Sequence, residues 1–352
     1  MSKGKIAIVG MGIAGAILSE KLQDEAYHIT IFNKKNPSCS SRVAAGMFNS
    51  IIPRRVTKSW LSDELNPVIQ EYYPSLETKL ESTFFYSKDL LHIFEYVKEQ
   101  NDWLSKANKE KFKGYFEPDP LFYPTNPMLH SPLGGILIKQ AGYCHTGVML
   151  DSFESYYKEK GFYVEGLIDS KDIESKNGKY YIDSLEFDKV IFCEGVENNK
   201  NKWFKDLPFK FAKGELLHVK IKGLELEEIL LGGVFLIPWG GKDEYLLGST
   251  FQWDFTHALP TEEAKEELLS RIKAYVPNGE IEILEHRAGI RPAVKDRRPL
   301  IGKHPEEDGI YIFNGFGSKA ISLAPYFAKQ MVSYLDGTEE IHEEVNVIRF
   351  LN

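Results

Sequence analysis

The segment KIAIVGMGIAGAILSEKL, residues 5–22, decides the fold of this chain. Residues 5–9 form a short apolar run with a β-branched bias, which predicts a strand. A glycine turn with GxGxxG spacing follows at residues 10–15, and apolar residues at helical spacing come after it. Residues 28–32 supply a second strand. The order strand, glycine turn, helix and strand predicts an α/β chain that contains a βαβ unit.

The glycine turn has the residue types that a dinucleotide site needs. Gly10 permits a tight turn, Gly12 lets a pyrophosphate approach the backbone, and Gly15 lets the helix pack against the strand. Ile13 and Ala14 open a helix whose free N–H groups and positive dipole end would face the phosphates. The alternative is a glycine turn in a doubly wound sheet that binds no ligand.

The end of the second strand departs from the usual fingerprint. An Asp or Glu is expected there, because a carboxylate bonds the ribose hydroxyls. This chain has Asn33 and Lys34 instead. Asn33 can hydrogen-bond a hydroxyl, but without a charge, so this position favours the alternative without a ligand.

Composition limits the classes of partner. The 352 residues suggest about two domains, and the 43% hydrophobic content is enough for a sizeable core. The formal net charge is −8, so no global basic field would attract nucleic acid or an anionic membrane. We therefore expect neither nucleic acid nor a membrane as a partner.

The cysteines and the N-terminus predict a cytoplasmic protein. Cys39, Cys144 and Cys193 are scattered and show no CxxC spacing, which favours a reducing compartment and argues against a metal site. The first strand begins close to Met1 and leaves no room for a signal peptide. No apolar run reaches the ~18 residues that a membrane span requires.

Two loops after the second strand are candidate binding segments. Residues 38–47 are mostly small and could lie flat against a planar ligand and donate N–H groups, although an ordinary turn explains them as well. Arg54 and Arg55 follow an apolar run. They form a solvated surface or, if the loop faces a pocket, bind an anionic substrate.

The rest of the chain alternates between two patterns. Residues 57–110 are predicted to be mostly helical, and a proline-rich connector at 114–132 is predicted to cross between domains. Antiparallel strands are expected from residue 214 to about 286, with a helix at about 261–275. Residues 288–292 predict a compact turn. A second strand, glycine turn and helix start follows at 309–318, with the helix ending near Leu335.

Several motifs in order carry a family resemblance. The segments are residues 10–15, 44–47, 213–215, 237–238, 247–250, 288–292, 299–305 and 323–325. With them the chain resembles the FAD-dependent D-amino-acid oxidase family, and within it the glycine oxidases. The resemblance covers nearly the whole length, and motifs in the same order are far more specific than one GxGxxG.

The resemblance implies an architecture of two domains. A Rossmann-like FAD-binding domain would be discontinuous, made of residues 1–50, 133–205 and 287–352. A substrate-binding domain with a large antiparallel sheet would comprise residues 51–132 and 206–286. The fold class is therefore α/β or α+β.

The resemblance also implies a chemistry. A hydride would pass from a carbon bearing an amine to FAD, giving an imine, and we expect O2 or another acceptor to take the electrons. The segment around Arg291 has no cysteine, unlike the sarcosine oxidases that bind flavin covalently, so FAD is expected to be non-covalent.

The implied site residues fall into two groups. Arg291 matches the arginine that forks onto the substrate carboxylate, and Arg54 is a further substrate candidate; the alternative for Arg291 is a structural salt bridge. The expected FAD-binding residues are Gly10, Gly12, Ile13, Ala14, Gly15, Asn33, Lys34, Arg42, Ala44, Ala45, Gly46, Met47, Ile168, Gly195, Gly315, Phe316, Gly317, Ser318 and Lys319.

Two departures from the glycine oxidases leave the substrate open. Phe235 stands where they have an active-site tyrosine, and Ser318, followed by Lys319, stands where they have a second arginine. We count Phe235, Ser318 and Lys319 with Arg291 as catalytic-site residues. Arg54, Arg55 or Lys319 could replace the lost positive charge, or the pocket could favour a larger or N-substituted amine.

Two further hypotheses stay open. Residues 314–319 also resemble the flavin domain of the bifunctional enzyme that modifies the tRNA wobble uridine, which oxidises a carboxymethylaminomethyl group. The departures at Phe235 and Ser318 equally allow a flavin-binding protein without turnover. The sequence does not give the stereochemistry of the substrate, a general base or the oligomeric state.

Overall fold

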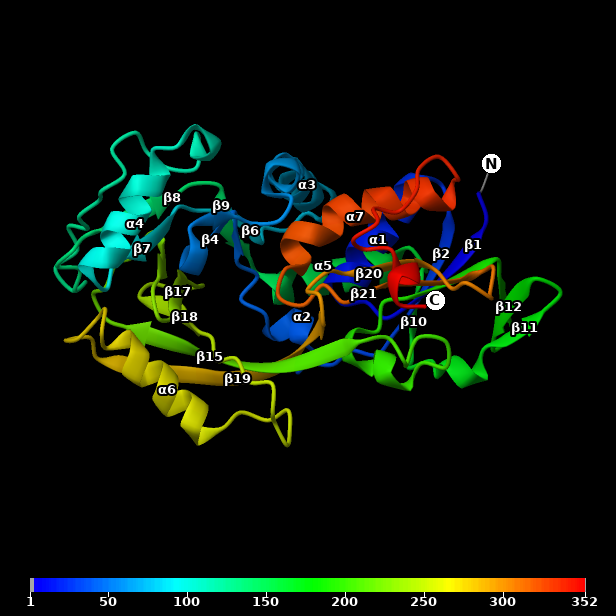
Figure 1. The fold of residues 1–352 in the computed structure, drawn as a ribbon. Coiled ribbons are helices and arrows are strands. Elements are labelled where there is room, and N and C mark those ends of the chain that lie inside the picture. The colour runs from blue at the N-terminus through cyan, green and yellow to red at the C-terminus, as the bar shows by residue number, and fades with distance from the viewer. Residues whose placement is uncertain (1–2, 352) are drawn as a thin grey trace.

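A six-stranded sheet forms the half of the molecule that contains both ends of the chain (Figure 1). The computed structural model describes residues 3–351. The strand order is β10 (Tyr163–Glu165), β2 (His28–Asn33), β1 (Lys5–Val9), β14 (Lys189–Phe192), β21 (Ile310–Asn314) and β20 (Leu300–Lys303). The first five strands run parallel, and β20 pairs antiparallel with β21 at one edge. The α/β fold with a βαβ unit expected from residues 5–32 is confirmed.

Alternation along β1 sends side chains to two different layers. Ile6 and Ile8 pack with helices α1 (Ile13–Asp24), α5 (Thr146–Glu159) and α7 (Ala320–Leu335). Ala7 and Val9 face the opposite side, where a small antiparallel sheet covers them. That sheet contains β11 (Glu174–Lys176), β12 (Lys179–Ile182) and β13 (Leu185–Phe187). The parallel strands are therefore buried on both faces, as such strands require.

A seven-stranded sheet forms the other half. Its order is β19 (Ile281–Val294), β15 (Phe209–Ile221), β18 (Glu244–Gly248), β17 (Phe235–Pro238), β16 (Ile229–Leu231), β7 (Leu90–Ile93) and β8 (Gly135–Ile138). All neighbours are antiparallel except β16 and β7. The expected large antiparallel sheet is confirmed. Its two longest strands, β15 and β19, reach from this half towards the first (Figure 1).

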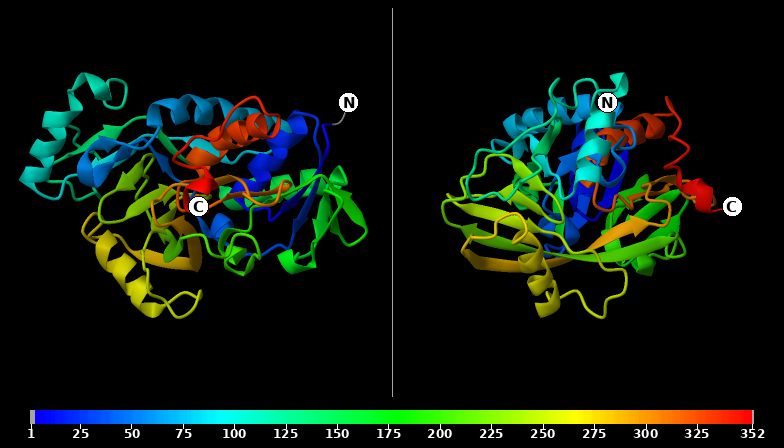
Figure 2. Two further views of the ribbon diagram at one scale, coloured as in Figure 1. Left: turned by 45° about the vertical axis from the view of Figure 1, so that its right-hand side comes forward. Right: turned by 60° about the vertical axis from the view of Figure 1, so that its left-hand side comes forward.

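The remaining elements cover or connect these sheets. Helix α6 (Glu262–Ile272) lies on the outer face of the seven-stranded sheet, and α1 and α7 lie on the opposite side of the molecule (Figure 2). Helix α3 (Ser62–Leu80) packs against α7, and α4 (Val97–Ala107) lies at the far end. The shorter elements are α2 (Ser40–Val43), the sheet β3 (Phe48–Asn49), β9 (Ala141–Cys144) and β6 (Phe85–Ser87), and the pair β4 (Ile51–Ile52) and β5 (Thr57–Lys58).

The helical prediction for residues 57–110 was wrong in its middle. Helices α3 and α4 are present, but β6 and β7 lie between them. All four residues of β7 are buried, with Leu90 in one core cluster and Leu91 and Ile93 in another. A strand buried on both faces is a continuous apolar run, which periodicity alone does not distinguish from a buried helix.

The compact turn predicted at residues 288–292 was also wrong. Arg291 and Pro292 belong to β19, which continues to Val294 and pairs with β15 along its whole length. Gly289 and Pro292 suggested a turn, but β19 is an edge strand of the sheet. An edge strand tolerates proline because one side of its backbone needs no ladder partner.

The domain boundaries stay a prediction, and the strand pairing leads us to propose a different position for one of them. Strands from residues 5–33, 163–192 and 300–314 build the six-stranded sheet. However, β8 pairs with β7 in the seven-stranded sheet, so the boundary drawn at residue 133 precedes a strand of the other half. The connector at 114–132 likewise joins two elements of that half. We place the boundary after β8.

Candidate functional site

The glycine turn between β1 and α1 is crowded at each glycine. Gly10 has φ +96°, and a Cβ there would lie 2.6 Å from the Cys193 carbonyl oxygen. A Cβ on Gly15 would lie 2.1 Å from the Gly10 carbonyl oxygen, and one on Gly12 would lie 2.7 Å from Ser41 Oγ. Gly12, the N-cap residue of α1, has no side chain to cap the helix, and the hydroxyl of Ser41 accepts from the Ile13 N–H. The turn therefore has the close packing that a phosphate-binding turn needs.

Asn33 stabilises this turn through its side chain. Its Oδ1 accepts a hydrogen bond of 3.0 Å from the Met11 backbone N–H, and its Nδ2 donates to the Tyr163 hydroxyl at 3.1 Å. Tyr163 donates in return to the Asn33 carbonyl oxygen. Asn33 thus holds the turn in place, while Lys34 is exposed.

The short helix α2 brings the loop at residues 40–47 against the same turn. Ser41 Oγ accepts from the Ile13 backbone N–H at 3.1 Å. Gly46 has φ +63°, and a Cβ there would overlap the Cys144 carbonyl, because the segment of Ala44, Ala45, Gly46 and Met47 runs directly along β9. Only glycine fits such a close backbone approach in a left-handed conformation.

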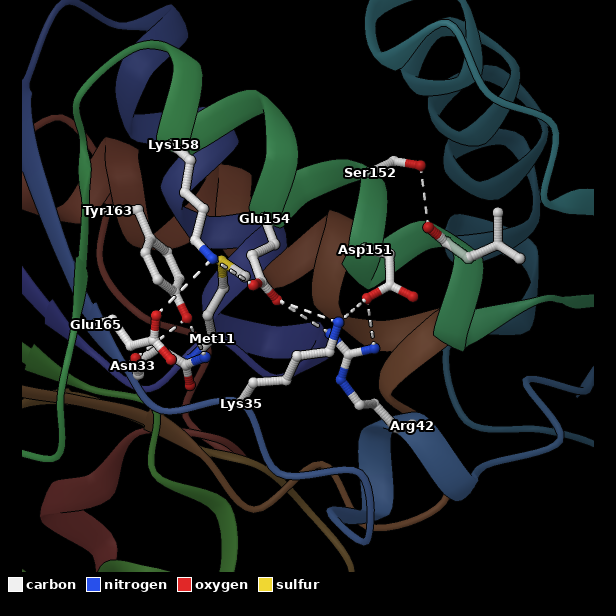
Figure 3. Close-up of polar contacts among 11 residues, drawn as sticks. Met11, Asn33, Lys35, Arg42, Asp151, Ser152, Glu154, Lys158, Tyr163 and Glu165 are labelled. Carbon is white, nitrogen blue, oxygen red and sulfur yellow. Dashed lines mark hydrogen bonds and ion pairs between the residues drawn. The ribbon is translucent and has the colours of Figure 1, made fainter.

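Arg42 faces helix α5 and lies in a network of ion pairs (Figure 3). Its guanidinium lies 2.9 Å from Asp151 Oδ1 and 3.3 Å from Glu154 Oε2. Lys35 pairs with Asp151 at 2.7 Å, and Lys158 pairs with Glu154 at 2.8 Å. The positive charge of Arg42 is therefore matched within the protein, and the network ties the loop after β2 to α5.

The ends of β14 and β21 meet beside the first glycine turn. Asn314 Nδ2 donates to the Gly195 carbonyl oxygen at 3.0 Å, and Asn314 Oδ1 accepts from the Gly315 N–H at 2.8 Å. Gly195, Gly315 and Gly317 all have positive φ. Helix α7 begins at Ala320 with no side-chain cap, so it offers an open helix N-terminus at this edge.

Glu194, two residues beyond the end of β14, is a partly buried carboxyl group in this region. Burial raises its pKa to about 7, against the opposing effect of a 2.8 Å hydrogen bond from Asn201 Nδ2. The nearby charges of Glu197 and Asp169 raise the pKa further. Glu194 therefore titrates near neutrality in the folded protein.

Arg291 lies where β19 meets the turn at residues 315–317. The Gly317 N–H donates to the Pro292 carbonyl oxygen at 3.2 Å, and a Cβ on Gly289 would contact Val43 of α2. The guanidinium packs directly against Gly214 of β15. The β19 backbone beside it contacts both α2 and the turn at residues 315–317.

The guanidinium of Arg291 has no carboxylate partner. It donates to Ser249 Oγ at 3.0 Å, and to the backbone carbonyls of Thr250 and Lys213 at 3.4–3.5 Å. Burial lowers its pKa, and no acidic side chain among residues 3–351 opposes that effect. A half-buried arginine that meets only neutral acceptors is suited to bind an anion.

The other expected substrate and catalytic residues lie in different settings. Phe235 is buried and packs against Gly248 in an apolar cluster with Leu216, so it contributes shape. Ser318 is exposed. Lys319 Nζ donates to Ser59 Oγ at 2.7 Å, and desolvation together with Arg298 and Arg297 lowers the lysine pKa.

Three expected residues lie at the margins of this region. Arg54 is exposed in the 3-10 turn between β4 and β5. Ile168 packs at the edge of the core cluster that contains β14. Phe316 is buried against Phe313 of β21, at a centroid distance of 4.8 Å. The remaining expected glycines and loop residues are brought together around the N-termini of α1 and α7.

Sequence reasoning missed four residues that shape the region. Ser41, Tyr163 and Asn314 make the hydrogen bonds that hold the turns, and the Phe251 ring lies 5.2 Å from the Arg291 guanidinium. Ser41 lies in the loop at residues 38–47 and Asn314 in the segment 314–319, so their polar side chains could have been predicted to hold these turns. The partners of Tyr163 and Phe251 are distant in sequence and carry no local signal.

Residues 3–351 contain neither a helix suited to a membrane nor a cluster of metal ligands. No helix in this range is long and apolar enough to cross a membrane. No group of three or more His, Cys, Asp or Glu side chains in the same range could hold a metal ion.

Comparison with known proteins points to one family. The family model described as "FAD dependent oxidoreductase" matches residues 5–334. The glycine oxidase of Pseudomonas aeruginosa is 29% identical over 159 residues, which cover 44% of this chain and 43% of that protein. The tRNA 5-methylaminomethyl-2-thiouridine biosynthesis bifunctional protein MnmC of Campylobacter concisus is 25% identical over 319 residues, covering 86% of this chain and 48% of the relative. The matches thus span less than half the length of either relative.

A solved structure shows the same fold. The crystal structure of glycine oxidase from Geobacillus kaustophilus superposes with a TM-score of 0.78, with 97% of each chain covered and 20% sequence identity. At this identity the likeness concerns the fold alone.

Proposed function

Because this chain belongs to the FAD dependent oxidoreductase family, we propose that it oxidises the carbon–nitrogen bond of a carboxylate-bearing amine to an imine. It is an oxidoreductase with FAD as its cofactor. The choice of a carboxylate-bearing amine is supported by Arg291, a half-buried guanidinium without an acidic partner among residues 3–351. The relatives named glycine oxidase support the same substrate class.

The residues around the two glycine turns fit FAD. A Cβ at Gly10, Gly12 or Gly15 would collide with the backbone or with Ser41, and the N-terminus of α1, with Ser41 Oγ on its Ile13 N–H, would face a pyrophosphate. When bound, FAD supplies the ring that accepts a hydride from the substrate carbon. We propose non-covalent binding, because none of the three cysteines lies on β19 or in the turn at 315–319.

The protein side of the reaction consists of binding and orientation. Arg291 would receive the substrate carboxylate with two parallel N–H donors, and Ser249 Oγ fixes one of its nitrogens at 3.0 Å. This fork fixes the carbon to be oxidised relative to the cofactor, which is the main contribution positioning makes to rate. The apolar cluster of Phe235, Leu216 and Ile237 excludes water from one side of the site.

Lys319 is the second cation we assign to the site. It lies at the open end of α7, with Ser59 Oγ as its hydrogen-bond acceptor. Its charge, added to the dipole of α7, would favour negative charge on a bound anion or ring edge. We assign no general base, and we propose O2 as the final electron acceptor and the cytoplasm as the location.

An anaerobic titration tests this function. The purified protein is mixed without oxygen with glycine, sarcosine, proline and a set of D-amino acids, and the visible flavin absorbance is followed. We expect at least one of these amines to bleach the flavin band. A flavin spectrum that stays oxidised with every primary and secondary amino acid would refute the proposed reaction.

A second candidate function is oxidation of an amine attached to tRNA. Basic side chains gather near the proposed substrate site, since Arg297 and Arg298 lie close enough to Lys319 to lower its pKa. Arg298 also lies 4.0 Å from the Trp60 ring. The resemblance to the MnmC protein points the same way. Binding of tRNA that weakens steeply with salt would support this function, and no binding at low salt would exclude it.

A further inference from the structure

Residues 213–215 of β15 pass directly behind the Arg291 guanidinium. Gly214 faces that side chain, and a Cβ there would lie 2.2 Å from Arg291 Nη2. Because side chains alternate along a strand, Lys213 and Glu215 point to the opposite face of the sheet. The contacts of Arg291 account for Gly214 alone, and the two charged neighbours have a different task.

Lys213 and Glu215 form a buried ion pair on the back of the sheet. Lys213 Nζ lies 2.7 Å from Glu215 Oε1, and the two side chains are 2% and 0% exposed. Burial opposes ionisation of Glu215, but hydrogen bonds from Lys213 and Thr261 lower the pKa of its carboxyl group. His286 Nε2 lies 2.9 Å from Glu215 Oε2 at the margin of the pair. Since a buried ion pair adds little stability over apolar residues of the same size, this pair is better explained by what it holds.

The ion pair holds the far end of the loop 249–261. Lys213 Nζ donates to the Leu259 carbonyl oxygen at 2.6 Å. Glu215 Oε2 accepts from the Thr261 N–H at 2.8 Å, and Glu215 Oε1 accepts from Thr261 Oγ1 at 3.0 Å. Thr261 also caps the N-terminus of α6. The end of the loop is therefore tied to the two charges of the pair.

The near end of the same loop supplies the neutral acceptors of Arg291. Ser249 Oγ accepts from the guanidinium at 3.0 Å, and the Thr250 carbonyl oxygen accepts at 3.4–3.5 Å. The Thr250 N–H donates to the Glu215 carbonyl oxygen at 3.1 Å, and Thr250 Oγ1 accepts from the Glu215 N–H at 2.9 Å. The Lys213 backbone also pairs with this end of the loop, through two hydrogen bonds. The same two residues of β15 thus hold both ends of the loop.

We propose that Lys213 and Glu215 are positioning residues for the proposed reaction, which hold the loop 249–261 from behind so that its near end fixes the orientation of Arg291. This rests on the proposed function, since Arg291 must be the anchor for the substrate carboxylate. A loop released at its far end would take more conformations at Ser249 and Thr250. The guanidinium would then lose its fixed direction, and with it part of its preference for a carboxylate.

A binding experiment that needs no turnover tests the proposal. N-acetylglycine and N-acetylglycinamide differ only in the carboxylate, and their acylated nitrogen makes both of them poor hydride donors. Each is titrated into the FAD-loaded protein, and its Kd is read from the change in flavin absorbance. We expect the acid to bind at least roughly tenfold more tightly than the amide in the unsubstituted protein.

Two variants release the far end of the loop. Lys213→Met combined with Glu215→Leu replaces the ion pair by apolar groups of similar size and leaves neither charge buried alone. Thr261→Val removes the hydroxyl that bonds Glu215 and keeps the volume. We expect each variant to lower the preference for the acid at least about threefold, with less than about a twofold change in the Kd of the amide. Hydrogen exchange at residues 249–252 should become faster in both, and Thr261→Ser, which keeps the hydroxyl, should retain the preference.

Lys79→Met is the matched control. Lys79 of α3 also pairs with a buried carboxylate, Glu20 of α1, at 2.8 Å. This variant should lose stability and keep the preference for the acid. A preference that survives in both the double variant and Thr261→Val would overturn the proposal, as would an equal loss in Lys79→Met. Thr261→Val decides the outcome by itself if the double variant does not fold.

Failure of this inference is distinguishable from failure of the proposed function. An unsubstituted protein that binds the acid and the amide equally has no carboxylate anchor, which refutes the proposed substrate class and this inference with it. A protein that prefers the acid to the same extent in every variant keeps Arg291 as its anchor and refutes only the positioning role of Lys213 and Glu215.

Discussion

Arg42 and Arg291 are two arginines that the sequence assigned to a ligand, Arg42 to FAD and Arg291 to the substrate carboxylate, and the structure gives them opposite surroundings. Arg42 lies within 3.3 Å of two carboxylates, Asp151 and Glu154 (Figure 3). Arg291 donates to a hydroxyl and to backbone carbonyls, and it has no acidic partner among the described residues. The charge of Arg42 is already compensated, whereas that of Arg291 remains for a ligand.

This difference separates the two ends of the proposed site. At the cofactor end, polar side chains such as Asn33 and Arg42 bind other parts of the protein. We therefore propose that backbone N–H groups and helix ends bind the cofactor. At the substrate end, a partly buried charge lacks its partner. Four predictions sharpen or break this comparison, from the largest expected effect to the smallest.

Replacing Arg291 should have the largest effect. Arg291→Met removes both donors to the substrate carboxylate, and Arg291→Lys keeps a charge but loses the fork. We expect kcat/KM for the best amino acid to fall roughly 100- to 1,000-fold in Arg291→Met, because truncating one partner of a buried charge pair costs about 2–5 kcal/mol. Steady-state kinetics, with FAD content measured in parallel, provide the test.

The matched control for Arg291 lies on the same strand. Arg287 pairs with Glu285 on β19, so its charge is compensated as that of Arg42 is. Arg287→Lys should leave kcat/KM within about threefold. Equal losses in the Arg287 and Arg291 variants would show that the strand, rather than an uncompensated charge, controls activity.

The cofactor end should instead be sensitive in its backbone. Gly15→Val places a side chain where a Cβ alone would lie 2.1 Å from the Gly10 carbonyl oxygen. We expect a loss on the order of 3 kcal/mol in the free energy of unfolding and a protein that purifies without flavin colour. Thermal unfolding and the visible spectrum measure both effects.

Gly147 of α5 supplies the comparison for this variant. A Cβ there would meet nothing within 4 Å, so Gly147→Ala should leave FAD content unchanged and stabilise the protein by up to about 1 kcal/mol. Full flavin occupancy in Gly15→Val would contradict the close-packed turn.

Glu194, near the cofactor end, is a carboxyl group whose desolvation is only partly offset by a hydrogen bond from Asn201. Its pKa is raised from 4.5 to about 7. Between pH 4.5 and pH 7 the folded state therefore keeps a proton that the unfolded state has already lost. The free energy of unfolding should therefore fall as the pH rises from about 4.5 to 7, by no more than roughly 3 kcal/mol. Glu194→Gln should remove this dependence and stabilise the protein more at pH 8 than at pH 4.5.

Denaturant unfolding of both proteins at pH 4.5, 6 and 8 measures this difference. Asp206→Asn, at an exposed carboxyl group, serves as the control and should leave the pH profile unchanged. An identical pH profile in Glu194→Gln and the unsubstituted protein would mean that Glu194 titrates normally.

Arg42→Ala should have the smallest effect. Lys35 and Lys158 remain near Asp151 and Glu154, so the carboxylates keep cationic partners after Arg42 is removed. We expect a loss of about 1 kcal/mol in the free energy of unfolding and a change of less than about fivefold in the Kd for FAD. Fluorescence titration of the apoprotein with FAD measures the second quantity, and a loss of flavin binding as complete as in Gly15→Val would break the comparison.

The sequence predicted those parts of the fold whose signals are local. The strand, glycine turn and helix at residues 5–22 follow each other directly, and α7 ends at Leu335 as expected. Strand β7 and the far end of β19 were missed because their pairing partners decide them: β16 and β8 bury β7, and β15 holds Arg291 in an extended edge strand. Glycine and proline indicate a turn only where no such partner is present.

The candidate site was predictable in its residue types but not in its contacts. Asn33 was expected to hydrogen-bond a ribose hydroxyl as an uncharged side chain. Instead, its side chain forms hydrogen bonds with Met11 and with Tyr163, which lies 130 residues further along the chain. The suitability of Arg291 for an anion depends on which side chains are absent around it, and sequence spacing does not reveal that.

One measurement tests the central claim, that the free charge of Arg291 selects a carboxylate-bearing amine. The best-reacting amino acid and its methyl ester are each mixed anaerobically with the FAD-loaded protein and with Arg291→Lys, and the rate of flavin bleaching is recorded. The claim predicts rapid bleaching by the acid, at least roughly tenfold slower bleaching by the ester, and loss of this difference in Arg291→Lys. Equal rates for acid and ester in the unsubstituted protein would contradict it.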